Sequence, residues 1–123
     1  STSRRQRQMC IRDRIKMSVK IIEEESRTVA VLSGEIDHHN AKNLRMEIDF
    51  ALRENQPQEL ILDFSDVGFM DSSGIGLVMG RYKLMQELNG KVTVRNPPNH
   101  IRKVMRLSGI DRLASISSGQ EGI

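Results

Sequence analysis

Two adjacent serines, Ser72 and Ser73, stand between an acidic segment and an apolar, helix-like run. Asp66 and Asp71 precede them, and Gly74 follows them. The first backbone N–H groups of a helix lack partners and the helix dipole is positive there, so this position favours a capping serine and also a phosphate. The residues predict a hydroxyl that another protein phosphorylates as a switch. A purely structural capping role for both serines is the alternative.

Catalysis by Ser72 is a weaker interpretation of the same residues. A serine nucleophile needs a base, and the histidines of the chain are His38, His39 and His100. The G-x-S-x-G motif of serine hydrolases is incomplete, because Met70 stands where the first glycine belongs. We therefore expect a binding protein rather than an enzyme, with no catalytic residue.

Two further patterns carry little chemical information. Two histidines follow Asp37, but adjacent side chains point in different directions and no other ligands stand at metal-binding spacing, so we expect no metal. Gly74, Gly76 and Gly80 resemble part of a dinucleotide-binding fingerprint, but the third glycine comes one residue late. Close packing of the helix on a neighbouring strand explains such glycines more simply. We expect no cofactor, and a nucleotide-binding domain remains an alternative.

Composition and charge narrow the class of protein. The length of 123 residues suits one domain. Residues 1–16 carry a net charge of +5, and the whole chain carries +3, so the remaining residues carry −2. This slightly acidic balance predicts no nucleic-acid partner. Cys10 is the one cysteine, so no intrachain disulfide forms, and a cytoplasmic protein is the simplest interpretation. No apolar run approaches the roughly 18 residues of a membrane span, so we expect no membrane partner.

The hydrophobic pattern predicts an α/β fold. Alternating apolar residues over 15–21 and a second run over 28–32 predict an N-terminal hairpin. Further strands are expected at 60–64, 92–94 and 113–116, and helices between them act as crossovers in a mixed central β-sheet whose later strands are parallel. The inward-facing helix residues are expected to be Ala41, Leu44, Ile48 and Leu52, then Ile75, Val78 or Met79, Tyr82 and Met85, and finally Ile101, Val104 and Met105.

Two loops should meet at one edge of this sheet. Residues 34–40 follow one parallel strand, with Asp37 or Asn40 as the cap of the next helix, and residues 65–73 follow its neighbour. The carboxyl ends of parallel strands share an edge, where open α/β sheets place their sites. We therefore expect a rim that contains Asp37, Asp66, Asp71, Ser72 and Ser73.

The two ends of the chain are expected to lie outside this fold. Residues 1–14 are Arg-rich and predict a disordered or cloning-derived tail. Residues 15–117 form the expected domain, and residues 118–123 form a frayed C-terminus.

Three segments of the chain resemble a known family. They are Gly34–His39 (GEIDHH), Phe69–Gly76 (FMDSSGIG) and Gly80–Lys83 (GRYK). Together they resemble the STAS domains of anti-sigma factor antagonists, and the resemblance extends from about Ile15 to Ile116. The first and third segments favour the sporulation branch, which antagonises the anti-sigma-F factor, over the general-stress branch.

The resemblance implies a single STAS domain with a binding function. The unphosphorylated form would bind an anti-sigma factor that is also a serine kinase and so release the sporulation sigma factor. Phosphorylation of Ser72 would switch this binding off, and a serine phosphatase would reset it. An antagonist in the general-stress sigma pathway is the alternative. By match to the motifs, the partner-binding residues would be Asp37, His38, Asp71, Ser73, Gly74 and Ile75.

Overall fold

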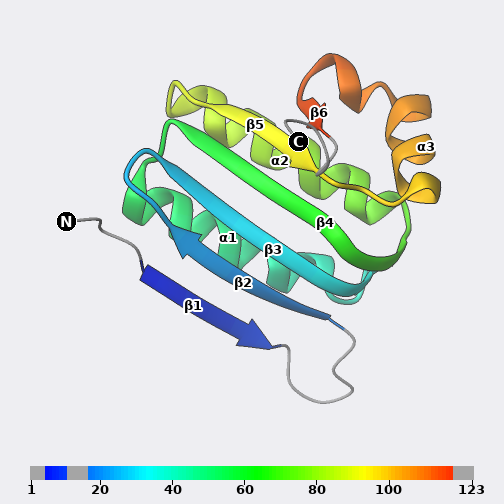
Figure 1. Cartoon of the computed structure of the whole chain (residues 1–123), viewed down its shortest axis with the longest axis horizontal. Helices are drawn as coiled ribbons and strands as arrows, with labels where there is room; N and C mark the ends of the chain where they lie inside the picture. Colours follow the sequence, from blue (N-terminus) through cyan, green and yellow to red (C-terminus); the bar gives the residue numbers. More distant parts are fainter. Residues whose placement is uncertain (1–4, 11–16, 118–123) are drawn as a thin grey trace, which may run out of the picture.

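A mixed β-sheet forms the centre of the structure, a computed structural model that describes residues 5–10 and 17–117 (Figure 1). Its strands are β1 (Arg5–Cys10), β2 (Met17–Glu23), β3 (Arg27–Ile36), β4 (Glu59–Met70), β5 (Lys91–Arg95) and β6 (Ser115–Ser117). The helices are α1 (Ala41–Asn55), α2 (Ser72–Glu87), α3 (Asn99–Ser108) and the short 3₁₀ helix η1 (Ile110–Arg112). The strands lie in sequence order, antiparallel from β1 to β3 and parallel from β3 to β6. The predicted mixed sheet with crossover helices is confirmed.

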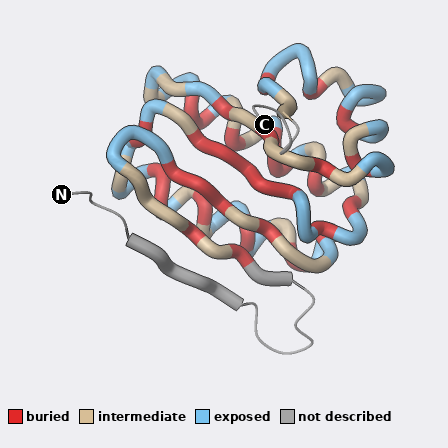
Figure 2. The backbone as a smooth tube through the Cα atoms, viewed as in Figure 1, coloured by how far each residue is buried: buried red, intermediate tan, exposed pale blue. Residues whose placement is uncertain are grey.

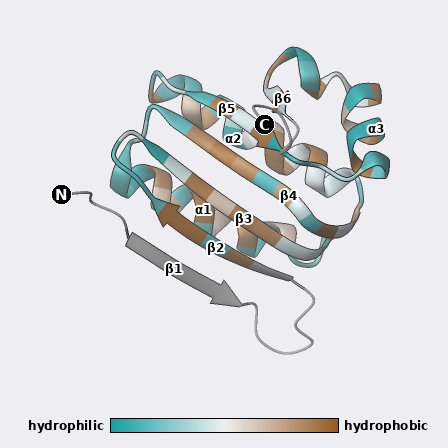
Figure 3. Ribbon diagram, viewed as in Figure 1, coloured by the Kyte–Doolittle hydropathy of each residue, from teal (hydrophilic) through white to brown (hydrophobic). Residues whose placement is uncertain are grey.

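The hydrophobic core lies between the sheet and the helices. Both α1 and α2 cover the same face of the sheet (Figure 1); α1 packs on β2 and β3, and α2 packs on β4 and β5. Leu60, Leu62 and Phe64 of β4 are fully buried in this core. Figure 2 shows β4 as a long buried run at the centre, and Figure 3 shows hydrophobic residues along it and its neighbours. No described helix is long and apolar enough to cross a membrane.

The helix faces agree with the sequence pattern except in α3. The predicted leucines and isoleucine of α1 are fully buried, and of the two alternatives in α2 it is Val78 that is buried, whereas Met79 is exposed. In α3, Ile101 and Met105 are buried, but Val104 is 38% exposed, so its prediction as an inward-facing residue is wrong. The helix is only three turns long, and two buried residues are enough to attach it to the core.

Strand β4 is longer than the sequence predicts. It continues to Met70, so residues 65–70 belong to the strand and not to the expected loop. The β3–β4 register shifts by one residue at two places, and such β-bulges break the two-residue alternation of buried side chains. Asp66 lies opposite Ser33 within the strand, on the order of 13 Å before its end at about 3.3 Å per residue. The prediction that Asp66 joins the rim is therefore wrong.

Strand β1 differs from the expected disordered tail. Arg5–Cys10 pairs antiparallel with Glu23–Ser18 of β2. The edge of β2 offers unpaired N–H and C=O groups, which any extended segment can satisfy whatever its side chains. Residues 1–4, 11–16 and 118–123 lie outside the described residues, and the domain boundaries at 15 and 117 stay a prediction.

Asp63 carries a buried charge on the sheet face away from the helices. It alternates with the core residues of β4, and its Oδ2 accepts hydrogen bonds from Arg95 at 2.8 and 3.0 Å. The backbone N–H and hydroxyl of Ser65 donate to Oδ1 at 2.9 and 2.7 Å. Burial by itself raises the pKa of Asp63, but the hydrogen bonds from Ser65 and Arg95 outweigh it and hold the pKa below its ordinary value.

We expect Asp63→Asn to lower the free energy of unfolding by about 1–3 kcal/mol at pH 7, because it removes the charged acceptor of Arg95. The folded-state pKa lies below the unfolded value of about 3.9, so this stabilisation is present above that value and is lost as the pH falls through the folded pKa. Urea unfolding at pH 7 and below about pH 4 measures it. The difference in the free energy of unfolding between wild type and variant should become smaller at acid pH. A difference that does not depend on pH contradicts the stabilising role of the Asp63 charge. Asp66→Asn, an exposed carboxylate of the same strand, is the control.

Candidate functional site

The predicted rim lies where β3 and β4 end. The N–H of Asp71, the residue after β4, donates to the carbonyl of Ile36, the last residue of β3, at 3.0 Å. Across the same edge, Nδ1 of His38 lies 3.9 Å from Oδ2 of Asp71. The loop that follows β3 and the start of α2 are therefore side by side, as the sequence predicts.

Asp37 shapes the loop that leads into α1. Its Oδ1 accepts hydrogen bonds from the backbone N–H groups of His39 at 2.9 Å and Asn40 at 3.2 Å, and its carbonyl accepts from Ala41 at 2.9 Å. The Asn40 side chain accepts from the N–H of Asp37 and donates to the carbonyl of Glu35. Asn40 occupies the N-cap position of α1 without a side-chain cap bond. The hydrogen bonds of Asp37 therefore close this loop, and they place His38 at its exposed tip.

Asp71, and not a serine, caps α2. Its Oδ1 accepts a hydrogen bond from the N–H of Ser73 at 2.8 Å, a cap that typically stabilises a helix by about 1 kcal/mol. Ser72 is the first residue of α2 and is exposed. Within the described part of the chain, its hydroxyl makes no hydrogen bond. The structural capping role that was the alternative for both serines therefore belongs to Asp71, which leaves the Ser72 hydroxyl accessible.

The three glycines of α2 have different surroundings. A Cβ added at Gly74 would overlap Cγ and Sδ of the buried Met70 side chain, so this glycine lets α2 start against the end of β4. Close packing is therefore confirmed for Gly74. At Gly76 and Gly80 an added Cβ would meet nothing within 4 Å, so the same prediction is wrong for these two glycines.

The predicted partner-binding residues divide into accessible and covered ones. Gly74 is buried, and Ile75 is half-buried and packs against the core. His38 is exposed, and Asp37, Asp71 and Ser73 are half-buried at the rim. A partner that approaches Ser72 therefore meets two carboxylates and an imidazole. The assignment of all six residues to partner binding stays a prediction.

A groove of about 300 Å³ adjoins this rim between α1 and α2. Two cationic side chains that line the groove, Lys42 and Arg45, come from α1. Ser73 lines the groove and also belongs to the rim. The sequence offers no local signal for it, because both cations have the spacing of an ordinary solvated helix face. The groove is lined by Ala41, Lys42, Arg45, Ser73, Gly76 and Leu77.

Arg81 of the third family-like segment is a buried residue that links α1 and α2. It is 5% exposed, and its Nε lies 2.7 Å from Oδ1 of Asp49 on α1. Its NH2 group donates to Asp49 Oδ2 at 3.3 Å, and its NH1 group donates to the carbonyl of Leu77 at 3.4 Å. This pair holds the two helices together behind the groove. Sequence reasoning missed it, because an arginine in an exposed-looking helix gives no sign of a partner 32 residues away.

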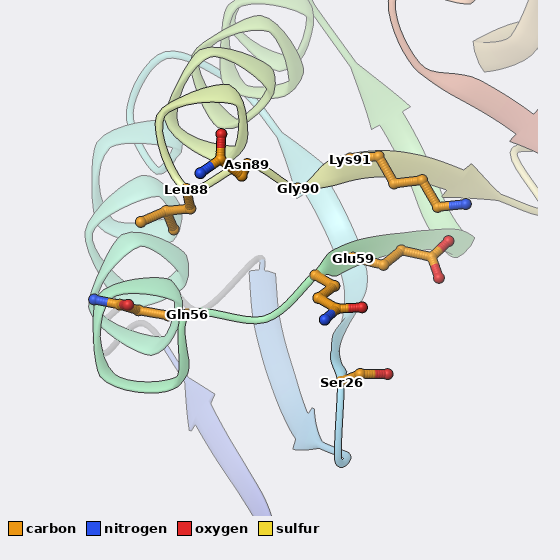
Figure 4. A pocket seen from close by; sticks show the side chains of 8 residues that line it. Ser26, Gln56, Glu59, Leu88, Asn89, Gly90 and Lys91 are labelled. Carbon is orange, nitrogen blue, oxygen red and sulfur yellow. The ribbon is translucent and has the colours of Figure 1, made fainter.

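A larger cavity, of about 740 Å³, lies at the opposite end of the sheet (Figure 4). Figure 4 shows Glu59 and Lys91 where β4 and β5 begin, with Gln56 after α1 and Leu88 after α2. The cavity is remote from Ser72, which lies at the other end of α2. Among residues 17–117 no three His, Cys, Asp or Glu side chains are grouped so as to hold a metal ion.

Comparisons with known proteins match both the sequence and the fold. The model of the STAS domain family matches residues 16–120. An anti-sigma F factor antagonist of Paenibacillus polymyxa is 38% identical over 104 residues, which are 81% of this chain and 87% of that protein. An anti-sigma-B factor antagonist of Bacillus subtilis (strain 168) is 27% identical over 88% of this chain and 97% of its own length.

Solved structures of an anti-sigma factor antagonist have the same fold. The unphosphorylated form of SpoIIAA superposes with a TM-score of 0.74 at 31% identity and covers 84% of this chain and 89% of its own. The phosphorylated form of the Bacillus cell fate determinant SpoIIAA superposes with a TM-score of 0.68, also at 31% identity, over 84% of this chain and 92% of its own. By family model, by relatives and by fold, this chain belongs to the STAS-domain family of anti-sigma factor antagonists.

Proposed function

We propose that the unphosphorylated protein binds an anti-sigma factor that is also a serine kinase, and that this binding releases a sporulation sigma factor. The sporulation branch is supported by the anti-sigma F factor antagonist of P. polymyxa, which is 38% identical to this chain, whereas the anti-sigma-B factor antagonist of B. subtilis is 27% identical. The general-stress pathway is the second candidate, supported by that relative. Transcription is a cytoplasmic process in bacteria, so we place the protein in the cytoplasm.

The accessible Ser72 hydroxyl is the observation that carries the proposal of a switch. It is exposed at the first position of α2, while Asp71 already satisfies the helix cap. A kinase can therefore modify Ser72 without breaking a bond that the fold needs, and a serine phosphatase can reach the same atom to reset it. SpoIIAA has been solved in unphosphorylated and phosphorylated forms, which supports the same switch here.

Electrostatics supply a mechanism for this switch. A phosphate adds about −1.5 to −2 charges at neutral pH, next to the carboxylates of Asp37 and Asp71. The positive end of the α2 dipole offsets part of that local repulsion, by about 0.3–1 kcal/mol. The modified domain therefore stays folded, while the surface that meets the partner becomes strongly negative.

A binding role suits the site better than hydrolysis by Ser72. Within the described residues the Ser72 hydroxyl donates to no base, and Nδ1 of His38 lies 3.9 Å from Oδ2 of Asp71. A serine nucleophile needs a base within hydrogen-bond reach and a third group that orients the base. The proposed function is therefore that of a regulator that acts by binding its partner.

We expect a sporulation-type anti-sigma kinase and ATP to add one phosphate to the purified chain, on Ser72, because this hydroxyl is exposed and uncommitted. Peptide mapping by mass spectrometry locates the phosphate. Ser72→Ala should take up none, and Ser73→Ala should still take up one on Ser72. A phosphate on Ser73, or none on a chain that binds the kinase, contradicts the proposed switch. A parallel reaction with a general-stress kinase separates the two pathways.

A further inference from the structure

We propose that the groove between α1 and α2 binds an acidic segment of the anti-sigma factor, through Lys42 and Arg45. This inference rests on the proposed function and adds to it a second contact surface and its chemistry. The groove of about 300 Å³ begins at Ser73 and is therefore continuous with the switch site.

The positive charge of the groove is available to a partner. Lys42 and Arg45 are both exposed, and neither forms an ion pair within the part of the chain that the structure describes. Arg81, the neighbouring cation, is already neutralised by Asp49 at 2.7 Å. A lysine and an arginine side by side complement carboxylates, and the guanidinium binds a carboxylate through two parallel hydrogen bonds.

Two arginines of α1 act on the charge of Arg81. Burial lowers the pKa of Arg81 most, Asp49 raises it, and the charges of Arg45 and Arg53 lower it further. Both arginines on α1 are therefore close enough to Arg81 to act on its charge. A partner segment in the groove meets the cations Lys42 and Arg45, whereas the rim carries the carboxylates of Asp37 and Asp71.

The shape of the groove suits close approach by another chain. Gly76 lines it, and a Cβ at this position would meet nothing within 4 Å. Glycine in a helix interior destabilises the helix relative to alanine, and no packing contact with the described residues requires a glycine here. Bare backbone at Gly76 is what a partner segment needs if it is to lie against α2.

The groove also extends the effect of a phosphate on Ser72 beyond the acidic rim on which Ser72 lies. A partner carboxylate held by Lys42 and Arg45 lies beside Ser73, one residue from the phosphorylated position. The phosphate repels this carboxylate and competes with it for the same cations. The charge that the kinase adds therefore acts on the contact that the groove provides.

Charge reversal in the groove tests the proposal. We expect Lys42→Glu and Arg45→Glu each to weaken binding of the unphosphorylated full chain to the anti-sigma kinase at least tenfold, measured by titration calorimetry at low and high salt. Lys103→Glu makes the same change in net charge on an exposed cation of α3 and should change the affinity less than twofold. Wild-type affinity for both groove variants, or an equal loss for Lys103→Glu, overturns the inference.

Two alanine variants test the shape independently of charge. Gly76→Ala and Gly80→Ala both place a methyl group in open space and should both raise the melting temperature. Only Gly76 lines the groove, so only Gly76→Ala should weaken binding, by at least fivefold. Equal affinities of the two variants overturn the inference. If these variants bind as wild type while Ser72 is still phosphorylated, the proposed function stands; if wild type binds no anti-sigma kinase, both proposals fail.

Discussion

Ser72→Asp should fold normally and bind the anti-sigma kinase about 3- to 100-fold more weakly than Ser72→Asn. One added charge about 6 Å from one partner carboxylate costs about 0.7–2.8 kcal/mol for effective dielectric constants of about 80 to 20. That energy corresponds to the stated range of affinity. A phosphate of about −2 charges doubles the energy, so the modified protein should bind more weakly still.

The comparison with Ser72→Asn isolates the charge, because the two side chains have nearly the same size. Titration calorimetry at fixed ionic strength gives both affinities, and urea unfolding verifies that both variants fold. The difference should shrink at about 1 M salt, where the Debye length is about 3 Å. Ser72→Ala should bind like the wild type and remain bound in the presence of kinase and ATP. Equal affinity of the Asp and Asn variants would falsify the electrostatic account.

The elements that follow a regular period could be predicted from the sequence. Alternation predicted the hairpin of β2 and β3, and helical spacing of Leu44, Ile48 and Leu52 predicted α1. The second half of β4 could not be predicted in this way. Its bulges place the buried residues Val67 and Met70 three positions apart. This spacing differs from the two-residue period of a strand, and it does not indicate a turn either.

The candidate site was predictable only where it is local in sequence. Strand order brought the loop of Asp37 beside Ser72, because two neighbouring parallel strands end there. Which residue caps α2 depended on backbone geometry, since Asp71 and both serines are all good capping residues. The groove with Lys42 depends on how α1 packs against α2, and no sequence pattern contains that information.

Replacing Asp49 should destabilise the protein more than replacing its partner Arg81. Asp49→Leu leaves the guanidinium of Arg81, a residue that is 5% exposed, without its counter-ion, and we expect a loss of about 3–5 kcal/mol in the free energy of unfolding. Arg81→Leu leaves a carboxylate whose side chain is 21% exposed, so water solvates it and the expected loss is about 1–3 kcal/mol. Urea unfolding at pH 7 measures both.

The double variant Asp49→Leu/Arg81→Leu separates the ion pair from the packing of its side chains. Two apolar residues remove the desolvation cost together with the attraction, so the double variant should recover most of the loss seen in Asp49→Leu. The resulting coupling energy is large because the two groups share one contact. Additive losses would mean that the charges do not interact, and equal losses in the single variants would mean that burial does not decide which partner matters. Asp49→Leu also leaves the positive charge of Arg81 without a counter-ion near Lys42 and Arg45. The charge near the groove should therefore be more positive in this variant than in the wild type.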